Sequence, residues 1–208
     1  MKVAVLGGTG SVGWGIAKQL AKKHQVIIGS RDPARANEAA QRIAGARGSD
    51  YAAAAKEAEV VVIAFPYEAM KTAGSLVGEL RGKLVLCPIN PIKMEGGILV
   101  YGLDRGSAAE ELAKILPGSR IATAFNNVPA GFLKADVTVP MDILVAADSR
   151  ETFEEAAKVI GSIPNLRPMY AGPLSEAAAV ERITPLVLNL ARLNDTGNLT
   201  AKFVSRKG

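Results

Sequence analysis

A glycine-rich loop near the start of the chain constrains the fold more than any other feature. The apolar run Val3-Ala4-Val5-Leu6 is typical of a buried strand, and Gly7-Gly8-Thr9-Gly10-Ser11-Val12-Gly13 follows it directly. Beyond the glycines, Ile16, Ala17 and Leu20 recur at helical spacing. A strand, a glycine turn and a helix in this order are the context of a dinucleotide-binding site, whose backbone approaches a pyrophosphate. The glycines fit two registers, one starting at Gly7 and one at Gly8, and both share Gly10 and Gly13.

The residues after the second predicted strand, 26–29, indicate which dinucleotide binds. An NAD site carries Asp or Glu here for the ribose 2′-hydroxyl, whereas this chain has Ser30 and Arg31. A carboxylate would repel a 2′-phosphate, and a guanidinium binds one through a bidentate fork. Asp32-Pro33 predicts the start of a helix, which places Arg35 in its first turn. The helix dipole disfavours a positive charge there, so this arginine suggests that an anion binds between it and the helix start. We therefore predict NADP as the cofactor; the alternative is that both arginines are solvated surface charges.

Composition narrows the remaining classes. The 208 residues carry 25 Lys and Arg against 20 Asp and Glu, a net charge of +5 that suits small polyanionic ligands. The chain has no Lys-Arg run and no aromatic platform for nucleic acid, and no apolar run of the ~20 residues that a membrane span needs. Because Met1-Lys2 leads directly into the first predicted strand, we expect no signal peptide. One cysteine, Cys87, excludes an internal disulfide, and one histidine, His24, excludes a histidine-rich metal site. We expect a cytoplasmic protein with no metal, nucleic-acid or membrane partner.

Strands and helices alternate along the chain, which predicts an α/β fold with a Rossmann-type, doubly wound parallel sheet. Helices are expected near 33–45, 68–79 and 108–116, and the glycine-rich segment 96–105 is expected to be irregular. The predicted strands are 3–6, 26–29, 47–51, 60–65, 83–87 and 120–125. Ligands of such sheets lie at the carboxyl ends of the strands. The cofactor-binding residues expected at that rim are Thr9, Gly10, Ser11, Val12, Gly13, Ser30, Arg31, Arg35, Phe65, Pro66, Ile89 and Asn90.

From about Met141 the pattern changes to a strand at 142–147, a helix at 150–161, a short strand at 166–170 and a helix at 175–192. Pro185 lies inside the last helix and should kink it. We predict a Rossmann domain at 1–140 and a small C-terminal α/β lobe at 141–208. Periodicity alone favours a packing role for this lobe.

Short motifs over nearly the whole chain carry a resemblance to a known family. They are Gly7-Gly8-Thr9-Gly10, Gly29-Ser30-Arg31, Ala124-Phe125-Asn126, Leu166-Arg167-Pro168, Ala171-Gly172-Pro173-Leu174 and Thr184-Pro185-Leu186-Val187-Leu188-Asn189. In these motifs the sequence resembles the F420-dependent NADP oxidoreductases of archaea and bacteria. The resemblance implies reversible hydride transfer between NADP(H) and coenzyme F420, a 5-deazaflavin, in a homodimer whose C-terminal lobe closes the deazaflavin site.

The same resemblance implies roles for individual residues. It matches Thr9, Ser30, Arg31 and Arg35 to the 2′-phosphate site. It matches Val128, Pro129 and Ala130 to the segment beneath the nicotinamide. Of these, Ala130 is expected to contact the cofactor. Asn126, Val128, Pro129, Thr184 and Leu199 are the residues expected at the deazaflavin. Archaeal members often carry His in place of Asn126 and an arginine in place of Ala178.

The predicted cleft contains no acid or base, which agrees with direct hydride transfer between two rings that the protein holds at contact distance. Val128 would then set the ring spacing, although packing after a strand explains it equally well. Asn90 and Asn126 would bond the carboxamide or the deazaflavin carbonyls, or else only form turns. Two other functions stay open. One is an NADPH-dependent flavin or ferric reductase, because the six-transmembrane metalloreductases carry a similar domain. The other is a non-catalytic NADP(H)-binding regulatory module.

Overall fold

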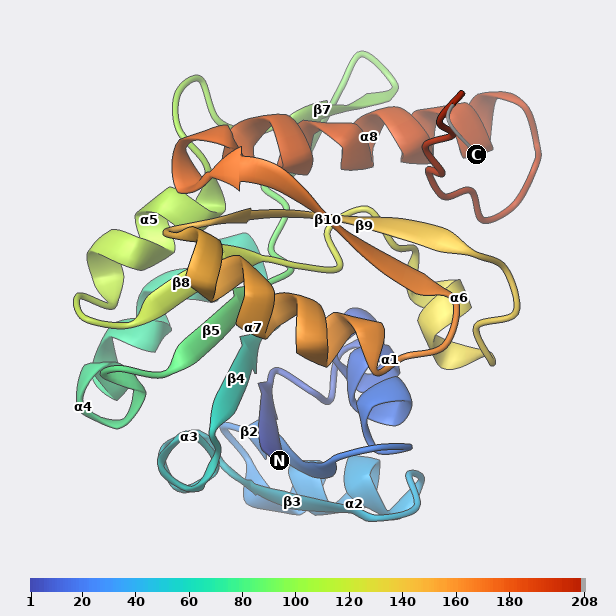
Figure 1. The fold of residues 1–208 in the computed structure, drawn as a ribbon. Helices are drawn as coiled ribbons and strands as arrows, with labels where there is room; N and C mark the ends of the chain where they lie inside the picture. Colours follow the sequence, from blue (N-terminus) through green and yellow to red (C-terminus); the bar gives the residue numbers. More distant parts are fainter. Residues whose placement is uncertain (207–208) are drawn as a thin grey trace.

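The computed structural model describes residues 1–206 and is built on one eight-stranded sheet, in the order β10-β9-β8-β5-β4-β1-β2-β3 (Figure 1). From β3 to β8 every neighbouring pair is parallel, and the order reverses between β1 and β4, as in a dinucleotide-binding fold. The strands are β1 (Lys2–Leu6), β2 (Gln25–Ser30), β3 (Ala46–Asp50), β4 (Val60–Ile63), β5 (Leu84–Cys87), β8 (Arg120–Thr123), β9 (Met141–Ala147) and β10 (Leu166–Pro173).

Helices cover both faces of this sheet, as the alternating pattern predicts. One face packs against α1 (Ser11–Leu20), α2 (Pro33–Gln41), α6 (Ala130–Lys134) and α7 (Arg150–Gly161). The other face packs against α3 (Tyr51–Glu57), the 3-10 helix η1 (Tyr67–Leu76), α4 (Val77–Leu80), α5 (Ala108–Ile115), the short 3-10 turn η2 (Leu174–Glu176) and α8 (Ala177–Leu193). The doubly wound fold class is confirmed.

The strand β1 illustrates why its sequence is apolar without a break. Val3 and Val5 belong to the core on the α1 side, whereas Ala4 and Leu6 belong to the core on the α3 side. Successive side chains of a strand point to opposite faces, so a strand covered on both faces needs apolar residues at every position.

The prediction of an irregular segment at 96–105 was wrong in part. The strands β6 (Ile92–Glu95) and β7 (Ile98–Tyr101) form an antiparallel hairpin. Its turn is Gly96-Gly97, with φ of +54° and +83°. Two adjacent residues at positive φ match the right-handed twist of a two-residue hairpin, and glycine adopts that conformation without strain.

Two further boundaries differ from the predictions. The segment predicted as a helix over 68–79 is mostly the 3-10 helix η1, and only its last turn, α4, is α-helical. The strand predicted over 120–125 ends at Thr123, because Phe125 adopts a φ of +63° that no strand accommodates.

The C-terminal segment continues the same sheet. The strand β9 pairs antiparallel with β8, and β10 pairs parallel with β9. Both predicted helices form, and α8 runs through the buried Pro185 as one helix along the top of Figure 1. Beyond α8 the chain returns to β9, where the carbonyl of Ala201 accepts from the Asp142 amide at 3.3 Å. The division of the chain at residue 140 stays a prediction.

Within residues 1–206, no helix is long and apolar enough to cross a membrane. The same residues bring together no group of three or more His, Cys, Asp or Glu side chains that could hold a metal ion. The Cys87 thiol is buried at the end of β5, and burial raises its pKa above the ordinary value. It is the small core residue that its position in an apolar run predicts.

Candidate active site

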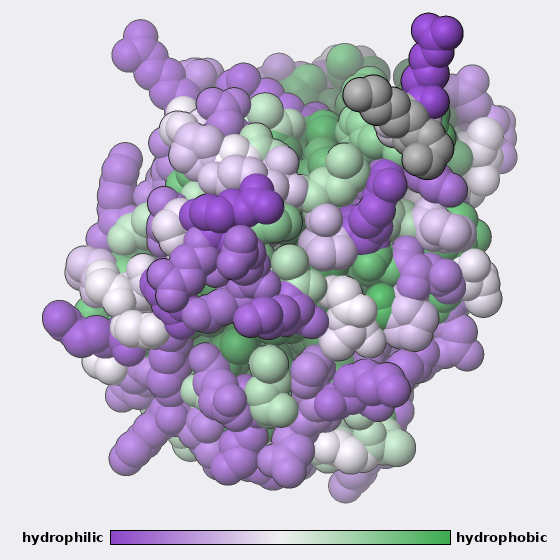
Figure 2. Space-filling model, viewed as in Figure 1, coloured by the Kyte–Doolittle hydropathy of each residue, from purple (hydrophilic) through white to green (hydrophobic). Residues whose placement is uncertain are grey.

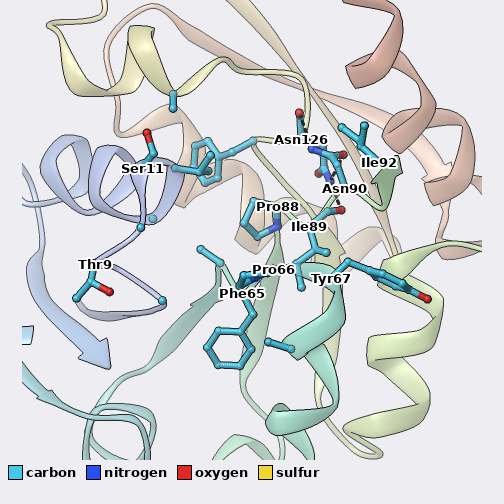
Figure 3. A pocket seen from close by; sticks show the side chains of 18 of the residues that line it. Thr9, Ser11, Phe65, Pro66, Tyr67, Pro88, Ile89, Asn90, Ile92 and Asn126 are labelled. Carbon is cyan, nitrogen blue, oxygen red and sulfur yellow. Dashed lines mark hydrogen bonds between the residues drawn. The ribbon is translucent and has the colours of Figure 1, made fainter. Parts of the chain in front are cut away.

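A cavity of about 680 Å³ opens at the carboxyl ends of the parallel strands (Figure 3). In Figure 3, Thr9 and Ser11 of the glycine loop lie on one side, Asn90 and Asn126 lie on the other, and Pro88 and Ile89 lie between them. The lining comes from the ends of β1, β4, β5 and β8, from η1 and from α8. A ligand in this cavity would therefore span the switch point of the sheet, where doubly wound folds bind nucleotides.

Three glycines of the loop are fixed by backbone packing. A Cβ on Gly8 would lie 2.9 Å from the Val5 carbonyl oxygen. Gly7 has a φ of +83°, and a Cβ there would lie 2.5 Å from the Ala64 carbonyl oxygen. A Cβ on Gly13 would lie 2.5 Å from the Gly7 carbonyl oxygen. A Cβ on Gly10 meets that oxygen only at 3.4 Å, an ordinary contact. Gly7 and Gly13 thus hold the loop against the sheet and the helix, and Gly10 leaves its space to a ligand.

The first turn of α1 faces the cavity without a side-chain cap. Its N-cap is Gly10, and Ser11, Val12 and Gly13 of the first turn line the cavity. The helix α2 differs, because the Asp32 carboxylate accepts from the amides of Ala34 and Arg35, at 2.9 and 3.5 Å. Uncapped amides at a helix start receive anions, so the α1 turn fits a pyrophosphate.

One end of the cavity is cationic. Arg31 and Arg35 line it, both solvent-exposed, and no Asp, Glu, Lys or His joins them among the lining residues of the described chain. Ser30 does not line it. Its hydroxyl is buried and accepts from the Asp32 amide at 3.2 Å, so it shapes the turn that carries Arg31.

The opposite end is a buried polar network. The Asn126 amide nitrogen donates to the Ile89 carbonyl at 3.1 Å and lies 3.3 Å from the Asn90 Oδ1. The backbone carbonyl of Asn126 accepts from Asn90 Nδ2 at 3.0 Å and from the Thr184 hydroxyl at 2.8 Å (Figure 3). Residues of the segment after β5 and of α8 therefore fix both the backbone and the side chain of Asn126.

One atom of this network is left over. Asn126 is 2% exposed, and its Oδ1 is buried with no hydrogen-bond partner among residues 1–206. Because the amide nitrogen faces two oxygens, the orientation of the amide is settled, and the free atom is an acceptor. An unsatisfied buried acceptor costs on the order of 1–3 kcal/mol, which a ligand N–H would recover. The site thus fits a ring that carries an amide N–H.

Besides Arg31 and Arg35, the titratable side chains of the cavity are Tyr51 and Tyr67 among the described residues. The Tyr67 hydroxyl donates to Glu111 at 2.9 Å, and burial, followed by the Glu111 carboxylate, raises the pKa of Tyr67 to about 12. Such a hydroxyl neither gives nor takes a proton near neutral pH. His24 lies elsewhere, bonded to the Ser162 hydroxyl.

Most residues predicted for the site line this one cavity. They are Thr9, Gly10, Ser11, Val12, Gly13, Arg31, Arg35, Phe65, Pro66, Ile89, Asn90, Asn126, Val128, Ala130 and Thr184. Ser30, Pro129 and Leu199 do not line it. Pro129 is the N-cap of α6, and Leu199 lies in the tail beside Asn198, whose side chain packs on Gly131.

Several lining residues are not in the set predicted from the sequence: Gly7, Tyr51, Ala64, Tyr67, Ala69, Thr72, Pro88, Ile92, Phe125 and Leu188. Tyr51 is the last residue of the strand predicted over 47–51, so the rim argument applied to that strand would have found it. Ile92 and Leu188 come from the hairpin and α8, whose position over the cavity no local pattern reveals.

Comparison with known proteins identifies the family of this chain. A family model described as NADP oxidoreductase, coenzyme F420-dependent, matches residues 2–91. The F420-dependent NADP reductase of Methanothermobacter marburgensis is 41% identical over 207 residues, which cover 91% of this chain and 92% of that protein. The metalloreductase STEAP3 of Rattus norvegicus is 30% identical over 88% of this chain but only 36% of its own length.

The fold has a solved counterpart. The crystal structure of an Arthrobacter sp. FB24 protein, described as a candidate F420-dependent NADP reductase, has a TM-score of 0.87 at 24% identity. The match covers 99% of this chain and all of that chain. At this identity it supports the fold alone, whereas the sequence relatives decide the family. This chain belongs to the family of F420-dependent NADP oxidoreductases.

Proposed function

We propose that this protein transfers a hydride reversibly between NADP(H) and coenzyme F420. One observation carries the proposal together with family membership: a single cavity joins an uncapped helix start and two arginines to a buried polar network, with no acid or base at that network. A reaction that moves a hydride between two bound rings needs binding and orientation from the protein, not proton transfer.

At the phosphate end, the amides of Ser11, Val12 and Gly13 would hold the pyrophosphate, and Gly10 gives it room. Arg31 and Arg35 would bind the 2′-phosphate, which NADP has and NAD lacks. The carboxylate of Asp32, the residue next to Arg31, caps α2 by accepting from the Ala34 amide, so it is bound to the helix start.

At the ring end, bound nicotinamide and deazaflavin supply the donor and acceptor carbons of the hydride. Val128 is 5% exposed and sits at the cavity wall, where it would set the spacing of the two rings. The Asn126 Oδ1 would accept an N–H, so it cannot serve the deazaflavin carbonyls directly. Orientation of this kind can supply about 7–11 kcal/mol of barrier reduction.

The test is NADPH oxidation by the purified protein with coenzyme F420, FMN, FAD and ferric chelates in turn. We expect turnover with F420 and little with the others. Turnover with flavins or ferric chelates, but not with F420, would favour the reductase activity that the likeness to the rat metalloreductase suggests. Binding of NADPH without any turnover would identify a regulatory module.

We also propose that the protein is a homodimer formed through α8. Leu186, Leu190 and Leu193 are 58%, 45% and 72% exposed and recur at helical spacing, so they share one face of that helix. Met94 and Ile98 of the β6–β7 hairpin are 55% and 45% exposed, and Figure 2 shows hydrophobic residues in the upper part of the molecule, where Figure 1 draws α8. Exposed large apolar side chains that share one face of a helix are typical of an interface.

The hairpin is fixed to α8, so both would enter that interface together. The Asn189 side chain donates to the Leu99 carbonyl at 2.7 Å and accepts from the Leu99 amide at 2.9 Å. Light scattering should give about twice the 21.7 kDa chain mass. Leu186→Asp combined with Leu190→Asp should restore the monomer mass, and a monomeric wild type would reject the dimer. The closing role of the lobe 141–208 and the cytoplasmic location stay predictions.

A further inference from the structure

Tyr51 is an aromatic residue of the cavity to which no role has been assigned. It is the first residue of α3 and follows β3 directly, at the carboxyl end of that strand. Because Asp50 of β3 pairs with Ser30 of β2, Tyr51 emerges beside the turn that carries Arg31. Its side chain is partly exposed and lines the cavity.

The position of the Tyr51 ring depends on a glycine. A Cβ on Gly29, in β2, would lie 3.3 Å from the Tyr51 Cδ1 and 2.5 Å from the Leu6 Cδ2. The ring thus occupies space over the end of β2 that a larger residue at position 29 would take. Gly29 has no positive φ that would otherwise require glycine. Glycine is therefore needed at position 29 because a larger residue would clash with Leu6 and the Tyr51 ring.

A second aromatic ring supports the first. The Phe65 ring, at the end of β4, lies 4.9 Å from the Tyr51 ring between centroids, with the planes tilted by 44°. Phe65 is 6% exposed, so Tyr51 is the more accessible of the two rings. The pair forms an aromatic surface at the arginine end of the cavity, continued by Ala69 and Thr72 of η1.

The pairing of Ser30 with Asp50 places this surface beside the phosphate-binding cations, because Arg31 and Tyr51 follow these two residues. Burial raises the pKa of the Tyr51 hydroxyl, and the positive charge of Arg31 acts in the opposite direction. On the proposed function, Arg31 and Arg35 hold the 2′-phosphate of NADP. The adenine is bonded to the same ribose, one carbon away from the 2′ position, so the base must lie against the cavity wall next to these arginines.

We propose that Tyr51, supported by Phe65, is the surface on which the adenine of NADP(H) stacks. Aromatic side chains bind bases through their π-faces, and Arg31 on the other side adds a cation to the same ring. The inference rests on the proposed function and extends it, because it assigns the base-binding residue of the cofactor.

The experiment measures binding of adenosine 2′,5′-bisphosphate by calorimetry to wild type, Tyr51→Phe, Tyr51→Leu and Tyr51→Ala. This probe carries the base and the 2′-phosphate but no nicotinamide. Tyr51→Phe should bind within about twofold of wild type, whereas the Leu and Ala variants should bind about tenfold more weakly. The Leu variant keeps an apolar side chain of moderate size, so its loss reports the missing ring.

Reduced nicotinamide mononucleotide, which has no adenosine, is the matched control as hydride donor. All four proteins should use it with the same kcat/KM. Equal binding of the bisphosphate by the Leu and wild-type proteins would overturn the role of Tyr51, and so would an equal loss toward the mononucleotide. If wild type does not bind the bisphosphate but oxidises NADPH, the 2′-phosphate site is misplaced and the stacking proposal fails with it. If Tyr51→Leu alone binds normally, the NADP function stands without it.

Discussion

The two ends of the cavity are built in different ways. Arg31 and Arg35 at the phosphate end are exposed, lie four residues apart and need only the Asp32-capped start of α2 to be in place. Asn126 at the ring end is 2% exposed and is held by residues 36 and 58 positions away in the sequence, Asn90 and Thr184.

This difference assigns different tasks to the two ends. Exposed cations bind an anion with little need of exact geometry, and their side chains are free to adjust to it. A buried network with every donor engaged has one arrangement, and it presents one acceptor at one place. We therefore expect changes at the phosphate end to alter NADP affinity, and changes at the ring end to alter the rate of hydride transfer more than that affinity.

The largest effect is expected at the ring end. Val128→Phe should push the two rings apart and lower the hydride-transfer rate by on the order of a hundredfold, since a misplacement of about 1 Å has a cost of that size. The affinity for NADPH should change little. Single-turnover absorbance of the deazaflavin, mixed with excess NADPH, measures the step, and Val128→Ala should give a milder loss. A wild-type rate for Val128→Phe would make Val128 a packing residue.

The next effect is expected at the phosphate end. Arg31→Ala removes a charge-assisted contact and should weaken NADPH binding by about 1.5–3 kcal/mol, with no change for NADH. Fluorescence titration measures both nucleotides. Arg42→Ala is the matched control, because Arg42 carries the same charge at the end of α2 but lies over the Trp14 ring instead of in the cavity. Equal losses for NADPH and NADH would remove the distinction between the two ends.

A smaller effect separates the two candidate donors to Asn126. Asn126→Ala should weaken binding of the ring that bonds its Oδ1 by about 1 kcal/mol. If the donor is the nicotinamide carboxamide, the loss appears with NADPH and disappears with its 3-acetylpyridine analogue, which has no carboxamide N–H. A loss confined to the KM of the deazaflavin would assign the donor to that ring instead. Equal losses with NADPH and the analogue, with an unchanged deazaflavin KM, would show that the free acceptor bonds neither ring.

The smallest effect lies outside both ends. The Ser162 hydroxyl donates to the Val159 carbonyl, so His24 Nε2 carries a proton and donates to Ser162, leaving a buried Nδ1 without a partner in residues 1–206. Burial lowers the pKa of His24 below 6.5, and the nearby N-terminal amine lowers it further.

The unfolded chain takes up a proton at His24 more readily than the folded chain. The contribution of His24 to the free energy of unfolding should therefore be fully present above about pH 6.5 and decrease as the pH drops below it. Thermal unfolding of wild type and His24→Gln across this range measures the difference. The variant should lose the His24 share of the pH dependence, with NADPH affinity and hydride transfer unchanged at pH 7. An identical pH dependence in both proteins would contradict the assignment.

The fold follows from the sequence where the deciding residues are neighbours. The run Val3–Leu6 and the glycine loop predict a strand, a turn and a helix, and Asp32-Pro33 predicts the start of α2, because capping and turn conformations involve a few adjacent residues. The same locality explains an error: the hairpin at Gly96-Gly97 was also readable from two adjacent glycines between apolar residues, and was missed.

The strand-end argument and the family motifs together predicted most of the residues that line the cavity. Local pattern alone left the C-terminal lobe without a role, since a packing helix and a cavity-forming helix have the same periodicity. Thr184 and Leu188 reach the cavity only because α8 crosses the sheet there. Part of what holds α8 is Glu181, a fully buried carboxylate that accepts from the amides of Ala108 and Ala109 at the start of α5.

The sequence by itself therefore determined the individual strands, the glycine cradle and the cationic end, because each depends on residues that are close together along the chain. Only the tertiary structure decided which atom of Asn126 is free and which ring stands over Gly29. Hydrogen bonds to Ile89, Asn90 and Thr184 and the contact between Tyr51 and Phe65 join different strands and helices. The physical reason is that the orientation of a buried polar group is set by all its neighbours at once, and those neighbours meet only after the chain has folded.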